Sequence, residues 1–159
     1  MSIEKGQEIP SVDLQIMGEK GPKKVNTTEL FSNKKVVMFA VPGAFTPTCS
    51  MTHLPGYITN ADKIKAKGVD TIICVSVNDA FVMGAWGKAQ NAEALVMLAD
   101  GSGELAKGLG LELDATGFGM GKRSQRYAMI VDNGVVSHLA VEPAGGLEVS
   151  DAESILAVL

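Results

Sequence analysis

Apolar residues along the chain fall into short runs that alternate with stretches of helical spacing. Residues 36–41 and 71–77 are almost continuously apolar, which is typical of strands covered on both faces of a mainly parallel sheet. Residues 12–16 alternate between apolar and polar, so we expect a half-buried strand of an edge hairpin there. Three further strands are predicted at residues 94–98, 126–131 and 135–141, with Asn133-Gly134 turning the last two into a hairpin.

Helical segments are predicted between these strands. Residues 57–67 carry apolar positions at helical spacing, and Asp79 suits the N-cap of a helix over residues 80–88. Pro55 should break or kink a helix that runs through it, because proline lacks the N–H and crowds the preceding turn. Shorter helices are predicted at residues 104–109 and from Ser150 or Asp151 to the last residue. This alternation predicts an α/β fold with a mixed central β-sheet flanked by helices.

Composition narrows the range of partners. The chain has 159 residues, of which 46% are hydrophobic and 20% charged, so we expect a single globular domain over residues 1–159. A net charge of −4 disfavours nucleic acid and anionic membrane surfaces as partners. No apolar run reaches bilayer length and residues 1–5 do not resemble a secretion signal. We therefore expect a cytoplasmic protein whose two cysteines are thiols.

One stretch contains the residues most suited to chemistry. A Pro-Gly turn follows the first of the buried strands, Thr46 suits a helix N-cap, and Pro47 suits the first helical position. Cys49 then lies about three residues into a helix, where unpaired backbone N–H groups and the helix dipole stabilise a thiolate. The alternative is a buried, unreactive cysteine that packs as a small apolar residue. Because α/β folds bind ligands at the carboxyl ends of their strands, the position favours a reactive sulfur.

Residues 42–50 and 53–57 resemble the active-site segment of the peroxiredoxins, and the resemblance is closer to the peroxiredoxin-5 class, which includes plant type II enzymes and bacterial relatives. The Pro-x-x-x-Thr-x-x-Cys pattern of that family is present as Pro42, Thr46 and Cys49. Later blocks of the family are matched by residues 75–83, 99–103 and 141–143. The resemblance covers essentially the whole chain and implies a thioredoxin-like fold.

The resemblance implies a thiol-dependent peroxidase that needs no cofactor. Cys49 would reduce hydrogen peroxide or small alkyl hydroperoxides and become a sulfenic acid, which glutathione with glutaredoxin, or thioredoxin, would reduce. Two alternatives stay open from the residues alone: a non-catalytic redox sensor or binding module that uses Cys49 oxidation, and a cysteine hydrolase. The resemblance also implies a homodimer, formed through loops that present Phe45, Phe81, Trp86 and Phe118.

The same resemblance assigns roles around the sulfur. Arg126 would stabilise the thiolate and orient the peroxide oxygens, since a guanidinium offers a fixed fork of donors. The Thr46 hydroxyl would contact the sulfur or the peroxide, and Pro42 would shield the sulfur from water. Substrate-binding positions, including backbone N–H groups that hold a peroxide oxygen, would be Gly43, Thr48 and Cys49. The neighbouring Lys122 and Arg123 are expected to form a solvated basic cluster.

His53 lies four residues after Cys49, so the two side chains share a helix face. A Cys-His nucleophile pair or a zinc site would suit this spacing, but zinc needs four ligands and only Cys74 and His138 are left to join them. A histidine that packs or hydrogen-bonds near the loop is favoured, and no metal is expected. The glycine-rich residues 117–123 imitate a phosphate loop with the wrong spacing and are expected to be a flexible connection.

Cys74 is the candidate resolving cysteine. The plant type II pattern has a second cysteine at this place, whereas Val149 stands where the animal peroxiredoxin-5 pattern has its resolving cysteine. A residue in the middle of a buried strand is equally suited to be an inert thiol. A disulfide needs Cα atoms within about 7 Å, which two rigid elements rarely offer without movement. We therefore expect an external thiol to be the main reductant of the Cys49 sulfenic acid.

Overall fold

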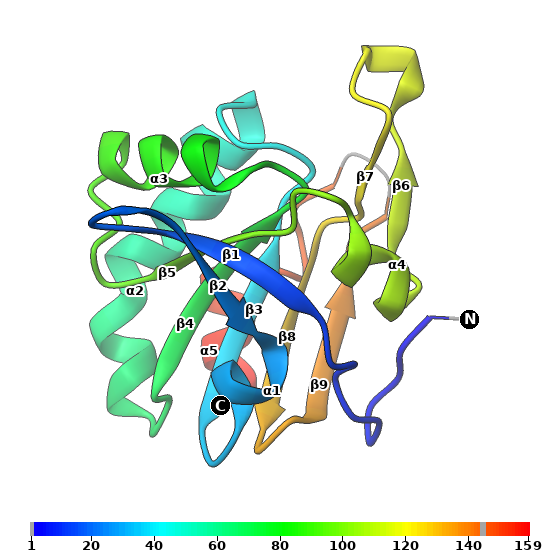
Figure 1. Cartoon of the computed structure of the whole chain (residues 1–159). Helices are drawn as coiled ribbons and strands as arrows, with labels where there is room; N and C mark the ends of the chain where they lie inside the picture. The colour runs from blue at the N-terminus through cyan, green and yellow to red at the C-terminus, as the bar shows by residue number, and fades with distance from the viewer. Residues whose placement is uncertain (1, 144–145) are drawn as a thin grey trace.

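The centre of the molecule is a mixed seven-stranded sheet with the strand order β2-β1-β5-β4-β3-β8-β9 (Figure 1). The structure is a computed structural model and describes residues 2–143 and 146–159. Strands β3, β4 and β5 run parallel, and the other pairings are antiparallel. The strands are β1 (Asp13–Gly18), β2 (Gly21–Asn26), β3 (Lys35–Ala40), β4 (Thr71–Ser76), β5 (Val96–Ala99), β8 (Tyr127–Asp132) and β9 (Val135–Val141).

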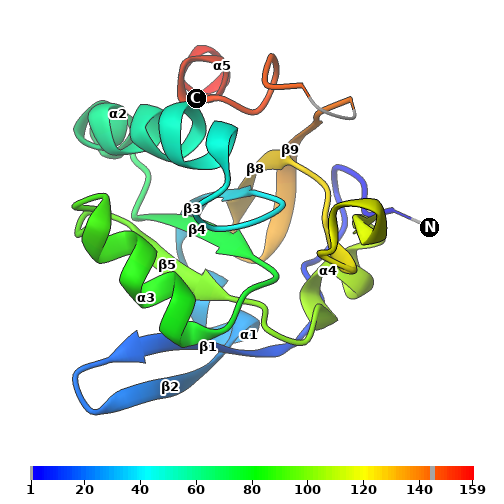
Figure 2. The same ribbon diagram turned by 90° about the horizontal axis from the view of Figure 1, so that it is seen from above.

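Helices cover both faces of the sheet. In Figure 2, α2 (Leu54–Ala66), α3 (Ala80–Ala89) and α5 (Ala152–Val158) lie on one side of the sheet and α4 (Glu104–Leu109) lies on the other. The second face also receives the short α1 (Thr27–Phe31). Alternate residues of β3 enter the two cores: Val37 and Phe39 pack beneath α2, α3 and α5, whereas Val36 and Met38 face α1 and α4. Within the described residues, no helix is long and apolar enough to cross a membrane.

The predicted elements are present with small changes of boundary. The hairpin between β8 and β9 turns at Asn133 and Gly134, whose φ angles of 47° and 81° are the pair of positive values that a type I′ turn requires. Asp79 accepts a hydrogen bond from the N–H of Val82 and caps α3, and Asp151 caps α5 in the same way. The mixed α/β sheet flanked by helices is confirmed.

The structure refines two local predictions. Pro55 does not end the helical segment: a π-helical turn, Cys49–His53, precedes it, and α2 begins at Leu54 with the proline in its first turn. The wide turn accommodates the missing N–H of the proline close to the helix start, where an absent donor costs little. The glycine-rich residues 117–123 lead from β6 (Glu112–Asp114) into β7 (Lys122–Ser124), the two strands of a β-ribbon that projects from the body in Figure 1. They are therefore a connection, as expected, and its flexibility stays a prediction.

The strand register brings distant parts of the chain to one edge of the sheet. Ala40, the last residue of β3, pairs with Tyr127, the first residue of β8, because these strands are antiparallel. Arg126 therefore lies beside the loop that follows β3. Strand β9 ends at the same edge, and the N–H of Glu142 donates to the carbonyl of Arg126 at 2.9 Å. Cys49, Arg126 and Glu142 meet here although up to 93 residues separate them in sequence.

Candidate active site

Cys49 lies at the start of the helical segment that follows β3. Pro47 and Thr48 open the helix, and the N–H of Ser50 donates to the carbonyl of Thr46 at 2.9 Å, as predicted for a helix that begins at Pro47. The Thr46 side chain is placed differently from a standard cap, since its hydroxyl donates to the Gly43 carbonyl at 2.6 Å. This bond closes a tight turn in the loop before Cys49. Cys49 has 0% of its surface exposed.

Arg126 is the charged side chain on the sulfur. Its Nη2 donates to Cys49 Sγ at 3.1 Å, and its Nη1 lies 2.7 Å from Nδ1 of His53. The two prongs of the guanidinium fix its orientation, and its positive charge lies where it can stabilise negative charge on the sulfur or on a bound oxygen. The structure thus brings Arg126 to the position that the resemblance implied.

His53 holds the guanidinium nitrogen of Arg126 that does not contact the sulfur. Its Nε2 lies 2.9 Å from the carbonyl of Ser150, which can only accept, so Nε2 carries the proton and Nδ1 accepts from Arg126. Burial, followed by the nearby charge of Arg126, lowers the pKa of His53 to about 4, although the Ser150 carbonyl opposes the shift. The ring is therefore neutral near pH 7. The prediction of a histidine that hydrogen-bonds near the loop is confirmed.

The loop before Cys49 is tied down on both sides. On one side the Ala44 N–H donates to Asn78 Oδ1 at 3.0 Å. On the other side Arg123 donates through Nη1 to the Pro42 carbonyl at 3.3 Å. The expectation that Arg123 is merely a solvated base is wrong, because the side chain is half-buried and links the ribbon to this loop, whereas Lys122 is exposed as expected. Directly after these two ties, Phe45 adopts the left-handed region with a φ of 63°, which is strained for a bulky residue.

Trp86 lies beneath the helix start instead of at the surface. Its side chain is fully buried, and its Nε1 donates to Ser50 Oγ at 2.9 Å. The prediction that Trp86 is presented to a partner is therefore wrong. The other three aromatic residues named from the sequence are exposed: Phe45 by 55%, Phe81 by 66% and Phe118 by 86%.

Cys74 lies in the middle of β4, in the same apolar core as Cys49, and both cysteines are free. Burial raises the pKa of the Cys74 thiol, and the nearby Cys49 raises it further, against a smaller opposing influence of Arg126. The group is therefore a thiol near pH 7, which is the less nucleophilic form. A strand residue also cannot approach another element without distorting the sheet.

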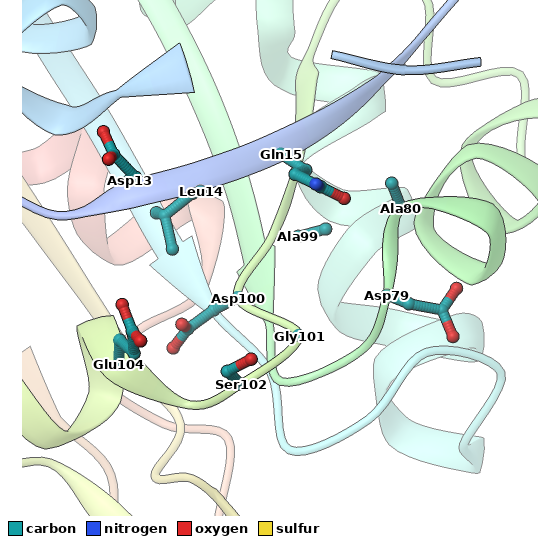
Figure 3. Close-up of a pocket in the computed structure, with 10 residues that line it drawn as sticks. All are labelled: Asp13, Leu14, Gln15, Asp79, Ala80, Ala99, Asp100, Gly101, Ser102 and Glu104. Atoms are coloured by element: carbon teal, nitrogen blue, oxygen red, sulfur yellow. The ribbon is translucent and has the colours of Figure 1, made fainter. Parts of the chain in front are cut away.

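A separate cavity of about 370 Å³ opens between β1 and the starts of α3 and α4 (Figure 3). Two of the carboxylates that line it are used as helix caps: Asp79 accepts from the N–H of Val82, and the oxygens of Asp100 accept from the N–H groups of Leu105 and Ala106. None of the residues around the sulfur lines it. Across residues 2–143 and 146–159 no group of three or more His, Cys, Asp or Glu side chains is arranged to hold a metal ion.

The hydrogen-bond partners of His53, and the residues Ser150 and Glu142, are not evident from the sequence. His53 was weighed as a partner of Cys49, whereas its polar contacts are Arg126 and Ser150. Ser150 and Glu142 carry no motif that predicts a place in the site. The one indication in the sequence is that His53 and Glu142 stand among apolar residues, because a polar side chain that is buried requires a hydrogen-bond partner.

Comparison with known proteins identifies the class. Residues 4–156 match the Redoxin family. Peroxiredoxin-2D of Arabidopsis thaliana is 47% identical over 156 residues, which cover 97% of this chain and 96% of that protein. A solved reduced peroxiredoxin from Vibrio vulnificus, in complex with hydrogen peroxide, is 61% identical with a TM-score of 0.95 over 98% of both chains. Peroxiredoxin 5 from Alvinella pompejana is 35% identical, with a TM-score of 0.87 over 98% of this chain and 96% of that one.

The chain belongs to the redoxin family and has the thioredoxin-like fold of its peroxiredoxin structural neighbours. Within it, the chain is a peroxiredoxin similar to the plant type II and peroxiredoxin-5 proteins, and hence a thiol-dependent peroxidase.

The neutral state of His53 predicts a dependence of stability on pH. Because burial lowers the pKa from 6.5 to about 4, the unfolded chain binds this proton more tightly than the folded chain does. The stabilisation is complete above pH 6.5 and is lost as the pH falls toward 4, by about 3 kcal/mol in total. Urea midpoints measured from pH 7 to 4.5 should therefore fall, and fall less in His53→Gln.

The control is His138→Gln, which removes the only other histidine and should keep the dependence that His53 causes. Hydrogen bonds from Glu148, Ser150 and Val149 lower the pKa of Glu142 in spite of its burial, so this carboxylate loses its contribution only below its ordinary pKa of 4.5. Parallel pH curves for the parent and His53→Gln would contradict the assignment.

Proposed function

We propose that the Cys49 thiolate reduces hydrogen peroxide and small alkyl hydroperoxides. The observation that carries the proposal is the 3.1 Å contact between Arg126 Nη2 and Cys49 Sγ in a site without exposed surface at the sulfur. The sulfur attacks the terminal peroxide oxygen, the O–O bond breaks, and the leaving oxygen departs as water or alcohol after taking up a proton. Sulfur loses two electrons and becomes a sulfenic acid.

We infer the roles of the loop residues from their resemblance to the peroxiredoxin motif and from their positions next to Cys49 in the chain. As the O–O bond breaks, negative charge moves onto the peroxide oxygens, and Arg126 together with backbone N–H groups at Gly43, Thr48 and Cys49 stabilises it. Thr46 holds the loop closed through Gly43 and offers its oxygen to the peroxide. In this proposal Pro42, which has no N–H to offer to water, shields the sulfur from competing contact with water.

Regeneration is the second half of the cycle. A thiol attacks the sulfenic sulfur, water leaves, and a second thiol then resolves the mixed disulfide. Because Cys49 is fully buried, a protein reductant or glutathione reaches it only after the start of the helix opens. The raised pKa and strand position of Cys74 support an external thiol, such as glutathione with glutaredoxin or thioredoxin. We place this reaction in the cytoplasm, where such thiols are abundant.

A homodimer is part of the proposal. Phe45 lies on the cysteine loop, Phe81 at the start of α3 and Phe118 at the tip of the ribbon, and all three are exposed. Exposed aromatic side chains of this size are typical of protein interfaces. A second copy of the chain that covers them would also restrain the loop before Cys49.

The peroxidase chemistry predicts distinct effects at Cys49 and Arg126. Cys49→Ser should abolish peroxide reduction, because a serine hydroxyl is neither ionised nor nucleophilic enough. Arg126→Lys should slow the reaction of Cys49 by about 100-fold, since one ammonium cannot contact the sulfur and His53 with two fixed prongs. Quenched-flow trapping of the remaining thiol, read by mass spectrometry, gives the second-order rate.

Lys122→Ala, an exposed change in the segment that leads to Arg126, is the matched control and should keep the parent rate. Full turnover in Cys49→Ser would end the peroxidase proposal. Oxidation of Cys49 in the parent without turnover in the presence of reducing thiols would favour the sensor alternative.

The route of regeneration is tested at Cys74. Cys74→Ser should retain most of the turnover supported by glutathione with glutaredoxin, because the external thiol does not use this residue. Peroxide-treated parent protein should contain no Cys49–Cys74 disulfide by mass spectrometry. Loss of turnover in the variant, together with that disulfide in the parent, would establish an intramolecular two-cysteine cycle in its place.

The oligomeric state is tested by light scattering of the reduced protein at micromolar concentration, which should give twice the chain mass. The double change Phe81→Ser and Phe118→Ser should produce monomers, because it removes apolar surface from the interface. Val158→Ser, at a residue 50% exposed near the last helix end, is the control and should remain dimeric. A monomeric parent would refute the dimer.

A further inference from the structure

Glu142 is a buried carboxylate whose partners are the backbone and one hydroxyl. It is 6% exposed and follows β9 directly. It accepts hydrogen bonds from the N–H of Glu148 at 2.9 Å, of Val149 at 2.8 Å and of Ser150 at 2.7 Å. The Ser150 hydroxyl adds a fourth donor at 2.7 Å. Three successive N–H groups that converge on one anion form a nest, which compensates the buried charge without a basic side chain.

The nest holds Ser150 in place. Its N–H and its hydroxyl both donate to Glu142, so the Cα of Ser150, from which the carbonyl projects, cannot shift without breaking these bonds. Its carbonyl accepts from His53 Nε2 at 2.9 Å and from the Tyr57 hydroxyl at 2.7 Å. Ser150 has no exposed surface, so no water replaces these partners at low cost.

The same carbonyl sets the proton on His53. As long as the Ser150 oxygen faces Nε2, the neutral ring keeps its hydrogen there and presents the Nδ1 lone pair to Arg126. With the other tautomer, two N–H groups would face each other and the guanidinium would lose its support. Glu142 also contacts Arg126 directly through its backbone N–H, which donates to the Arg126 carbonyl at 2.9 Å.

We propose that Glu142 is a positioning residue for the peroxidase reaction, acting through Ser150 and His53 to hold Arg126 on Cys49. The inference rests on the proposed function of Cys49 and adds a remote determinant of its rate. A displacement of about 1 Å at a group that stabilises the reacting atoms costs up to about 100-fold in rate. A residue that touches neither sulfur nor peroxide therefore controls the speed of the chemistry.

Glu142→Gln tests this proposal with little change of shape. The amide has one acceptor oxygen where the carboxylate has two, and its NH2 group opposes the N–H groups of the nest. The second-order rate with hydrogen peroxide should fall by about 10- to 100-fold. The ¹⁵N spectrum of the His53 ring should change from the pure Nε2–H tautomer of the parent to a mixture.

Ser154→Ala is the matched control for a loss of loop stability alone. Its hydroxyl donates to the Glu148 carbonyl at 3.2 Å, so the change loosens the same loop without touching the Glu142 carboxylate. It should keep the parent rate and the parent tautomer. Ser150→Ala, which removes one of the four donors and keeps the carbonyl, is a second variant in case Glu142→Gln does not fold, and should give a smaller loss in the same direction.

A double-mutant cycle tests whether Glu142 acts on Arg126 through His53. In a His53→Leu background, where the link to Arg126 is already cut, Glu142→Gln should lower the rate no further. An equal loss in both backgrounds, or an unchanged rate and tautomer in Glu142→Gln, would refute the inference. The parent separates this result from a failure of the proposed function: if the parent does not consume peroxide, the peroxidase proposal fails, whereas a reactive parent with an unaffected Glu142→Gln variant refutes only the role of Glu142.

Discussion

The site depends on holding a long, charged side chain against a sulfur that is removed from water. An arginine has about 2 kcal/mol of rotamer freedom to lose, so a guanidinium stays on one atom only if other groups hold it there. Here the start of β8 fixes the backbone and His53 fixes one prong, which leaves the other on Cys49. A protonated histidine would repel Arg126, so the burial that keeps His53 neutral is part of the electrostatic arrangement.

The π-helical turn explains how one short segment supplies two parts of the site. Cys49 opens the turn and His53 closes it, so the sulfur and the ring both lie beside Arg126 without bonding to each other. Widened turns of this kind occur frequently at functional sites. Pro55 follows at once and supplies no N–H, so one hydrogen bond is missing near the start of the helix, which is where a reductant must gain access.

Most of the fold could be predicted from the sequence, because period-two and continuous apolar patterns specify buried strands directly. Cys49 and Arg126 could be named from the motif and its resemblance. Glu142 and Ser150 could not, since their importance comes from hydrogen bonds between segments that only the strand register brings together. Arg123 and Trp86 were misplaced for a related reason: amphipathic side chains are exposed or buried according to tertiary neighbours that residue type does not reveal.

Trp86 places a natural fluorophore beside the active site. It is the only tryptophan of the chain, and its indole N–H ends on the residue next to the reactive sulfur. An opening of the helix start that exposes Cys49 would move Ser50 away from the indole and admit water to a ring that is fully buried here. The ultraviolet emission of the unmodified protein would then report that opening without an attached dye.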